Sequence, residues 1–370
     1  MVASLLLLHA TQHYSYHEYV VYTEPWMIAW NQSIRDVLVF LFTGKAFNIF
    51  ALLFGFTFYL IYDKQVKQGG DLTWRFIWRM ILLLGFGLFN VAFFAGDVLV
   101  SYAVCGVILV PLRKCSTRLL LVIAALFLLL PGEWYMYIRT LLDPQYVPFD
   151  NGYLNNYAPM KENLAKGEWL STIWSNISLG CYASSMWKFD MGRIAQTCAL
   201  FILGYAAGRE QLFDASAKSQ QFWVKLFCGS FIAAVVIYPF VMGMKALFIT
   251  DPRMQPLRDI SASWFDFSLT SITVSLFLLL YRTEAFRSLT KHLATYGKAS
   301  LSNYIMQSVM GCCIFYPVGL GLAPYLNMAS SALLALALIA LQIVATHFYL
   351  KKFKRGPLEA IWHRLTWIGR

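Results

Sequence analysis

The chain alternates long apolar runs with short polar segments, a pattern that predicts a bundle of membrane-spanning helices. A helix needs about 20 mostly apolar residues to cross a bilayer, and many runs approach that length. No run shows the alternation of a membrane β-barrel strand, so the predicted fold class is all-α. A leucine-rich fragment at the start brings the total to about ten transmembrane helices, two of them short or broken; the longer candidates are 34–62, 75–95, 97–112, 118–132, 191–209, 222–249, 263–282, 299–322 and 330–350.

Lysine and arginine residues fall mostly on one side of this predicted topology. The segments 10–33, 94–97 and 323–329 contain none of the 30 basic residues. Short loops rich in Lys and Arg stay in the cytoplasm, so both termini are predicted to be cytoplasmic. Composition agrees, since 59% of the residues are hydrophobic and only 13% are charged, against about 25% in soluble domains. The net charge of +11 is ascribed to cytoplasmic loops, and nucleic-acid binding is not expected.

All 370 residues are expected to form a single membrane domain. Its longest segment outside the cytoplasm is 133–190, which is rich in Trp, Tyr, Asn and Pro. Such clusters often lie at a membrane interface, so the segment is either an interfacial cap or a lid or saccharide platform. The seven cysteines include no C-x-x-C pair, and neither a disulfide framework nor a metal site is predicted.

The first apolar run is short and ends in titratable rings. In "LLLLHATQHYSYHEY" (5–19), His9 and His13 are four residues apart and share a helix face. The ten residues up to Ala10 rise about 15 Å, half the hydrocarbon thickness, so we expect a truncated first helix; a genuine half-helix or interfacial segment is the alternative. The two histidines are candidates for a general base or acyl carrier, for hydrogen-bonded packing, or for metal ligation.

Ionisable residues within apolar spans are costly and each suggests a function. Arg35 lies near the outer end of the 34–62 run, and Lys45 and Asn48 lie deeper on one face. Lys45 and Arg35 could hold an anionic group; alternatively, Lys45 pairs with Asp36 or Asp97 and only joins helices. Asp97, at the start of the next span, could orient a histidine, pair with Arg35, or act as a plain helix cap.

The segment "GKASLSNYIMQSVMGCCIFYPVGLG" (297–321) has polar residues crowded into its first turns. Asn303 and Gln307 share a face, and such residues commonly form hydrogen bonds between transmembrane helices. Pro317 and two later glycines then break the helix, which is tolerated at membrane depth only inside protein or beside a cavity. We therefore expect Asn303 and Gln307 to line a cavity.

Several blocks resemble a known family of bacterial membrane proteins. "GKASLSNYIMQS" (297–308), "FYPVGLGL" (315–322) and "FKRGPLEAIWHRLTW" (353–367) are similar to the C-terminal signature of the YeiB-like family, defined by domain of unknown function 418, a region expected here at about 220–370. "GKAFNIFALLFGFTFYL" (44–60) and "GDVLVSYAVCG" (96–106) resemble further blocks. The variant with histidines in the first helix looks like the Bacteroidetes branch, and members usually begin with a fuller first helix.

The resemblance implies a multi-pass protein of the bacterial cytoplasmic (inner) membrane whose biochemical role is unsettled. Its layout is similar to the transmembrane acyltransferase superfamily, whose members move an acyl group from cytoplasmic acyl-CoA to an envelope glycan or lipid-linked acceptor. His9 falls where a histidine of that superfamily would lie. By this analogy His9 or His13 is the catalytic base, Asp97 orients it, and Arg35, Lys45, Asn48, Asn303 and Gln307 bind substrate. Acyl-CoA is then a donor substrate, with no bound cofactor.

Two other classes stay open. A transporter for an anionic or hydrophobic solute would use Lys45, Arg35 and Asp97 as its path. A scaffold without turnover would use the uncharged 299–350 region for packing. The expected partners are the lipid bilayer and a small-molecule or glycan substrate, and the sequence leaves open whether the chain forms a homodimer.

Overall fold

The computed structural model describes residues 5–9, 24–67, 73–148, 152–248 and 250–368, and every regular element within these ranges is helical. This confirms the all-α class. Besides a short helix at residues 5–9, the α-helices are α2 (Pro25–Phe42), α3 (Lys45–Lys67), α4 (Thr73–Val91), α5 (Leu99–Gly106), α6 (Leu109–Leu112), α7 (Thr117–Leu128), α8 (Pro131–Leu142), α9 (Tyr157–Ala165), α10 (Trp169–Ser175), α11 (Cys181–Asp190), α12 (Arg193–Arg209), α13 (Ala217–Phe248), α14 (Gln255–Leu280), α15 (Glu284–Gly297), α16 (Ser300–Phe315), α17 (Met328–Lys352) and α18 (Pro357–Thr366).

Five helical segments of the described chain are long and apolar enough to cross a membrane. A sixth is added if α7 and α8, which meet at an angle of 41°, are taken as one span. The expected span 97–112 is instead two short helices, α5 and α6, and the expected span 299–322 is the 16-residue α16 followed by a tight turn. Length and composition therefore support a membrane protein with at least five spans, and they do not establish ten.

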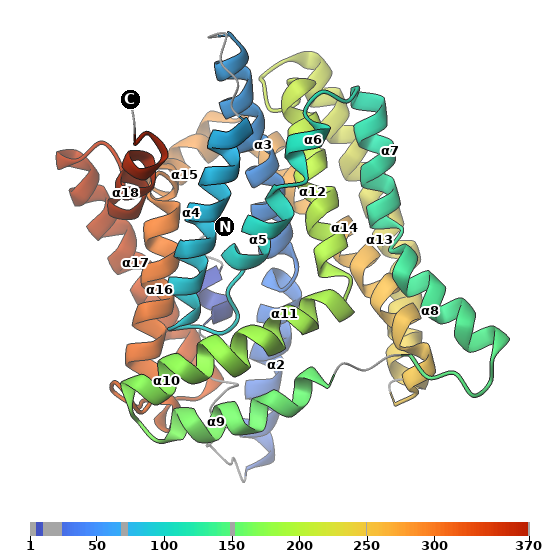
Figure 1. Cartoon of the computed structure of the whole chain (residues 1–370), viewed down its shortest axis with the longest axis vertical. Coiled ribbons are helices and arrows are strands. Elements are labelled where there is room, and N and C mark those ends of the chain that lie inside the picture. Colours follow the sequence, from blue (N-terminus) through green and yellow to red (C-terminus); the bar gives the residue numbers. More distant parts are fainter. Residues whose placement is uncertain (1–4, 10–23, 68–72, 149–151, 249, 369–370) are drawn as a thin grey trace.

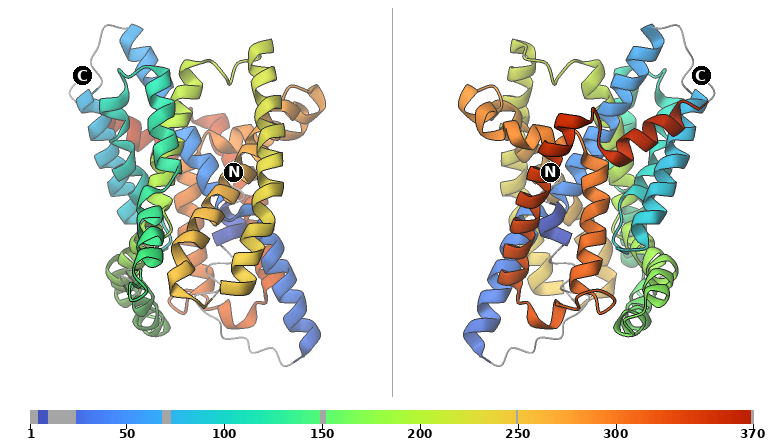
Figure 2. Two further views of the ribbon diagram at one scale, coloured as in Figure 1. Left: turned by 90° about the vertical axis from the view of Figure 1, so that its right-hand side faces the viewer. Right: turned by 90° about the vertical axis from the view of Figure 1, so that its left-hand side faces the viewer.

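The long helices run roughly side by side, and shorter ones cross their ends (Figure 1). Helices α9, α10 and α11 lie across one end of the bundle. A π-helical turn at Asn176–Gly180 joins α10 to α11. They come from the aromatic-rich segment 133–190, which is thus mostly helical. At the same end α2 diverges from its neighbours (Figure 2), and none of its residues is buried.

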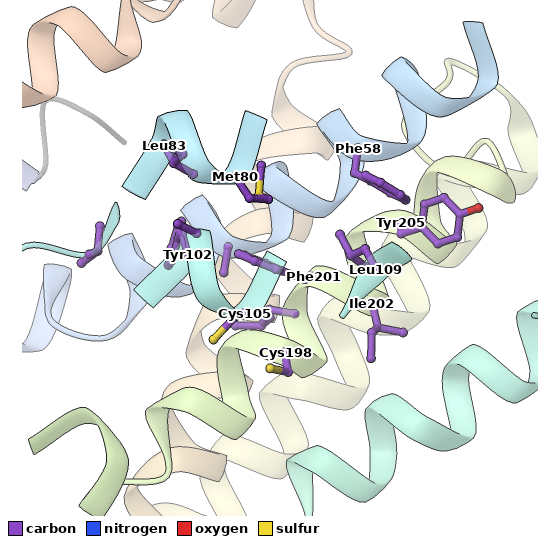
Figure 3. Packing of buried hydrophobic residues seen from close by; sticks show 14 of the residues in the cluster. Phe58, Met80, Leu83, Tyr102, Cys105, Leu109, Cys198, Phe201, Ile202 and Tyr205 are labelled. Carbon is purple, nitrogen blue, oxygen red and sulfur yellow. The ribbon is translucent and has the colours of Figure 1, made fainter. Parts of the chain in front are cut away.

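The core forms where α3 crosses α12, with α5 packed alongside (Figure 3). Tyr102, Phe201 and Tyr205 are fully buried there. Glycines allow the close crossing: a Cβ atom on Gly204 would lie 1.9 Å from the Leu52 carbonyl oxygen, and one on Gly55 would lie 2.0 Å from that of Phe201. The small residues of "GYAAG" (204–208) thus form a packing surface, as small residues often do between membrane helices.

Gly204 provides a test of this crossing. We expect Gly204→Ala to lower the free energy of unfolding by about 1–3 kcal/mol, because the added methyl group must push two helix backbones apart. The matched control is Gly229→Ala on α13, where a Cβ atom would have no neighbour within 4 Å and alanine should be neutral or slightly stabilising. Denaturant unfolding of both variants in the same detergent is the measurement, and equal effects would contradict the assignment.

The two C-terminal blocks of the sequence form one structural unit. The Glu359 carboxylate on α18 accepts hydrogen bonds from the backbone N–H groups of Leu301 (2.7 Å) and Ser302 (3.2 Å) at the start of α16. It also pairs with the Ser302 hydroxyl, which in turn accepts from the Leu358 N–H at 3.0 Å. A carboxylate here satisfies free N–H groups and favours the positive end of the helix dipole. Glu359 thus caps α16 from a distant part of the chain.

Removing this cap should weaken the fold. We expect Glu359→Ala to lower the free energy of unfolding by about 2 kcal/mol, since charged hydrogen bonds to half-buried groups are lost. Glu359→Gln should recover part of that loss because its side-chain oxygen still accepts. The control is Glu284→Ala in the first turn of α15, where Thr283 already provides the cap. A lower melting temperature for Glu284→Ala than for Glu359→Ala in thermal unfolding would refute this role.

Candidate functional site

A cavity of about 200 Å³ lies where several separate segments meet. The helix at 5–9, the turn between α2 and α3, the loop before α5, and helices α9, α11 and α12 all contribute to its wall. Its polar lining consists of His9, Thr43, Tyr157, Ser184, Lys188 and Arg193. One imidazole and two cationic groups therefore face a single enclosed space, which suits a polar or anionic ligand better than a lipid chain.

His9 is buried, with 3% of its surface exposed. Its ring centroid lies 4.5 Å from that of Phe94 and 5.6 Å from that of Tyr304. Its Nδ1 atom has no hydrogen-bond partner within the described part of the chain. A neutral imidazole has one acceptor nitrogen, and the unpartnered Nδ1 leaves hydrogen-bonding capacity of this ring unused within the described chain. His13, the second candidate base, lies outside the described residues.

Asp97 is held by three groups and reaches His9 only through an intermediate ring. Its Oδ1 accepts hydrogen bonds from Asn90 Nδ2 (2.8 Å) and the Tyr304 hydroxyl (3.2 Å), and its Oδ2 accepts from the Val100 N–H (2.8 Å). The bond to Val100 makes Asp97 a helix cap, one of the roles expected from sequence. Since Tyr304 touches the His9 ring, Asp97 positions Tyr304, and Tyr304 in turn contacts His9.

Lys188 completes this cluster from α11. Its ammonium group donates to the backbone carbonyl oxygen of Asp97, and the residue is buried with 4% exposure. A buried ammonium group is expensive unless it finds acceptors. Lys188 therefore ties α11 to the loop before α5 and brings positive charge to the wall of the cavity that also contains His9.

Lys45 pairs with a carboxylate that the sequence did not suggest. Its Nζ lies 3.8 Å from Asp266 on α14, and Arg193 binds the same carboxylate at 2.8 Å. Gly44, with φ +75°, makes room for Asp266, because a Cβ atom there would lie 2.3 Å from its Oδ2. The expected partners Asp36 and Asp97 are not bonded to Lys45. Two cations share one carboxylate, so a net positive charge remains beside the cavity.

The other predicted binding residues lie apart from the cavity. Arg35 is exposed on α2, and it does not meet Asp97 because the break at Thr43–Gly44 separates α2 from the buried α3. The neighbouring Asp36 accepts from Gln32 at 3.0 Å. Asn48 is fully buried and donates to the Thr270 hydroxyl at 3.1 Å, so it joins α3 to α14.

Asn303 and Gln307 form hydrogen bonds between helices rather than lining this cavity. Asn303 donates to the Tyr296 carbonyl oxygen at 3.1 Å and accepts from the Thr346 hydroxyl at 3.1 Å. Gln307 donates to the Tyr296 hydroxyl at 2.9 Å, and that hydroxyl donates to Gln342 at 2.7 Å. The network joins α15, α16 and α17, which is the packing role that sequence analysis gave as common for such residues.

A second, larger cavity of about 460 Å³, the inner cavity, lies among α3, α4, α5, α15, α16 and α18. Phe50 and Tyr102 line it, whereas Phe47 and Val98 line the His9 cavity. Phe50 stacks on Tyr102 at 5.5 Å and on Tyr304 at 6.3 Å. One layer of aromatic rings thus lies between the inner cavity and the His9 cavity.

Sequence reasoning missed Lys188, Arg193, Asp266 and Tyr304. Lys188 lies in the aromatic-rich segment 133–190, whose individual residues gave no separate signal. Tyr304 lies next to Asn303, and only Asn303 was predicted to bind substrate. Metal ligation by His9 gains no support, since no group of three His, Cys, Asp or Glu side chains in the described residues could hold an ion.

Fold and site together define an all-α protein with apolar helices fit for a membrane and a small, positively charged interior cavity. Residues 207–369 match the family model described as "Protein of unknown function (DUF418)". This match confirms the resemblance noted from the C-terminal blocks.

Two relatives extend the similarity to nearly the whole chain. "Uncharacterized protein YxaH" of Bacillus subtilis (strain 168) is 24% identical over 364 residues, which cover 93% of this chain and 85% of the relative. "Uncharacterized 39.9 kDa protein in amylase 3'region" of Bacillus acidopullulyticus is 21% identical over 353 residues, covering 89% and 82%. No solved structure matches the chain.

Proposed function

We propose that this protein is a membrane-embedded transferase that moves an acyl group from cytoplasmic acyl-CoA to a glycan or lipid-linked acceptor of the cell envelope. The observation that carries the proposal is the position of His9: its Nδ1 has no partner in the described chain, and the residue lines a cavity shared with Lys188 and Arg193. A buried base beside fixed positive charges is suited to activating a hydroxyl group and stabilising the anion that forms.

In this reaction His9 removes the proton of the acceptor hydroxyl while the oxygen attacks the thioester carbonyl carbon. The new C–O bond forms, the C–S bond breaks, and the proton passes from His9 to the departing CoA thiolate, so that atoms and charge balance. Lys188 and Arg193 stabilise the oxyanion or hold an anionic part of a substrate. Asp97 acts through Tyr304 to keep the wall beside His9 in place. His13 is the alternative base.

The proposed transferase crosses the membrane with a defined orientation. About ten spans with both termini in the cytoplasm would place the basic ends of α3, α4 and α17 inside the cell, as the positive-inside pattern favours. The protein would then reside in the bacterial cytoplasmic membrane, with α9–α11 on the outer side. The His9 cavity would lie towards the acceptor, and the inner cavity would lie towards the donor.

A transporter is the second candidate, and the pair of cavities favours it. A single layer of rings between two cavities resembles a closed gate, which a solute could pass without covalent change. In that case Lys188 and Arg193 would bind an anionic solute, and His9 would serve only as packing or a proton site.

One assay separates the two candidates. Purified protein in liposomes is supplied externally with acetyl-CoA carrying a ¹⁴C-acetyl group, while envelope lipids and glycans are enclosed. A transferase releases free CoA thiol and leaves label covalently bound to the enclosed acceptors. Label that accumulates inside as unchanged acetyl-CoA or acetate indicates a transporter. Thiol release and labelling no higher than in protein-free liposomes would count against the transferase.

A further inference from the structure

The inner cavity has the shape and lining of a site for one long alkyl chain. Its wall on α3 runs from Phe50 to Ile61, a separation of eleven positions that rises about 16 Å along the helix. Most of its lining side chains are apolar, including Phe54, Phe58, Met80 and Leu83. Leu53 and Leu293 also line it and are 39% and 46% exposed, so the cavity opens on the side of the bundle, where bilayer lipids have access.

Arg79 places a positive charge at one end of this apolar cavity. Its guanidinium lies over the Trp362 ring at 4.4 Å, and its Nη1 makes a long 3.5 Å bond to the Thr366 hydroxyl. Its Nε has no hydrogen-bond partner, and no carboxylate of the described chain lies within ion-pair distance. A half-buried arginine without a counter-ion, facing an open space, fits an anionic ligand.

Helix α18 limits the size of that anion. It lies across α4 (Figure 1), where Trp78 Nε1 donates to the Leu365 carbonyl oxygen at 2.9 Å and Arg75 lies over Trp367 at 4.2 Å. Trp362 and the buried Thr366 therefore close over the Arg79 end. A flat carboxylate fits beneath this cover, since it matches the guanidinium fork, whereas a bulky phospholipid headgroup would have to displace α18.

We propose that the inner cavity binds a long-chain fatty acid, with its carboxylate on Arg79 and its alkyl chain along α3 towards Tyr102. The inference is independent of the proposed transferase activity, because it rests only on the apolar lining, the unpaired cation and the cover by α18. Lys291 on α15 is exposed and does not line the cavity, so it provides a control for charge.

The test is photo-crosslinking in nanodiscs of zwitterionic lipid, with a palmitate analogue that carries a diazirine and an alkyne. Labelled peptides are expected from α3 and α4, and unlabelled palmitate should compete at least tenfold better than hexadecanol. Arg79→Leu should reduce labelling at least tenfold and abolish that preference, whereas Lys291→Leu should leave both unchanged. Arg79→Lys, which keeps the charge, should retain part of the labelling and covers the case in which Arg79→Leu does not fold.

A steric pair of variants tests the path of the chain. Thr57→Trp should block labelling because Thr57 lines the cavity, whereas Val236→Trp, at an exposed position of α13 that does not line it, should not. Equal competition by hexadecanol, equal effects of Arg79→Leu and Lys291→Leu, or crosslinks confined to other helices would overturn the proposal. Competition by phosphatidylglycerol as strong as that by palmitate would also overturn it, and would identify a phospholipid as the occupant.

Discussion

His9→Ala is expected to lower acyl transfer by about 10²- to 10⁴-fold, the usual contribution of a general base, while the helical bundle stays folded. The residue lies in a short helix and packs against Phe94 and Tyr304, so the substitution removes a few ring contacts and no hydrogen bond to Nδ1. His9→Gln, which keeps polarity and approximate size but cannot carry the proton, should be as inactive as His9→Ala. The measurement is transfer of a ¹⁴C-acetyl group in liposomes, normalised to folded protein.

The matched control for this variant is His292→Ala, an exposed histidine on α15 that should retain full transfer. His13→Ala separates the two candidate bases, because only removal of the true base should abolish turnover. Parental transfer rates in both His9→Ala and His13→Ala would exclude histidine catalysis from this segment. If acyl transfer by His9→Ala falls only as much as the amount of folded protein falls, His9 has a packing role and no catalytic role.

Asp266→Ala is expected to lower the free energy of unfolding by about 3–5 kcal/mol, the range for breaking a buried ion pair. The substitution removes the shared carboxylate of Lys45 and Arg193 and leaves two cations close together in a poorly solvated part of the protein. Adding Lys45→Met should recover part of the loss, since only Arg193 then lacks its partner. Unfolding of the single and double variants in denaturant, in one detergent, measures both effects.

Asp36→Ala is the control for the Asp266 series. Asp36 is exposed on α2, where its loss should change the free energy of unfolding by no more than about 0.5 kcal/mol. An Asp266→Ala variant as stable as Asp36→Ala would mean that Lys45 and Arg193 are adequately solvated. The charge cluster beside the His9 cavity would then not be a structural element.

The fold class could be predicted because apolar runs reveal helices directly. The number of spans could not, because breaks such as Thr43–Gly44 and Gly106–Val107 depend on how the pieces pack. The break after Thr43 had a further consequence: one apolar run from 34 to 62 became two helices with different surroundings. Arg35 therefore ended exposed on α2, whereas Lys45 was buried on α3.

Residues of the site could be predicted only where a single charged residue interrupts an apolar run. Lys45 and Asp97 stood out as charges in apolar runs, and both are buried. Their partners did not stand out: Asp266 is far along the chain from Lys45, and Lys188 is separated from Asp97 by 91 positions. Such pairings follow from tertiary contacts, and one sequence contains no record of them. The role of Tyr304 was hidden for the same reason, because a tyrosine in an apolar helix is usually plain packing.

The cap that Glu359 provides for α16 also affects how the protein is made. Glu359 follows Ser302 by 57 positions, so the first turn of α16 is synthesised well before the carboxylate that caps it. During that interval the free N–H groups in the first turn of α16 must donate hydrogen bonds to water or lipid headgroups. Insertion of this part of the protein is therefore completed only after translation has passed α18, and premature stop codons before Glu359 should yield chains that quality-control proteases remove.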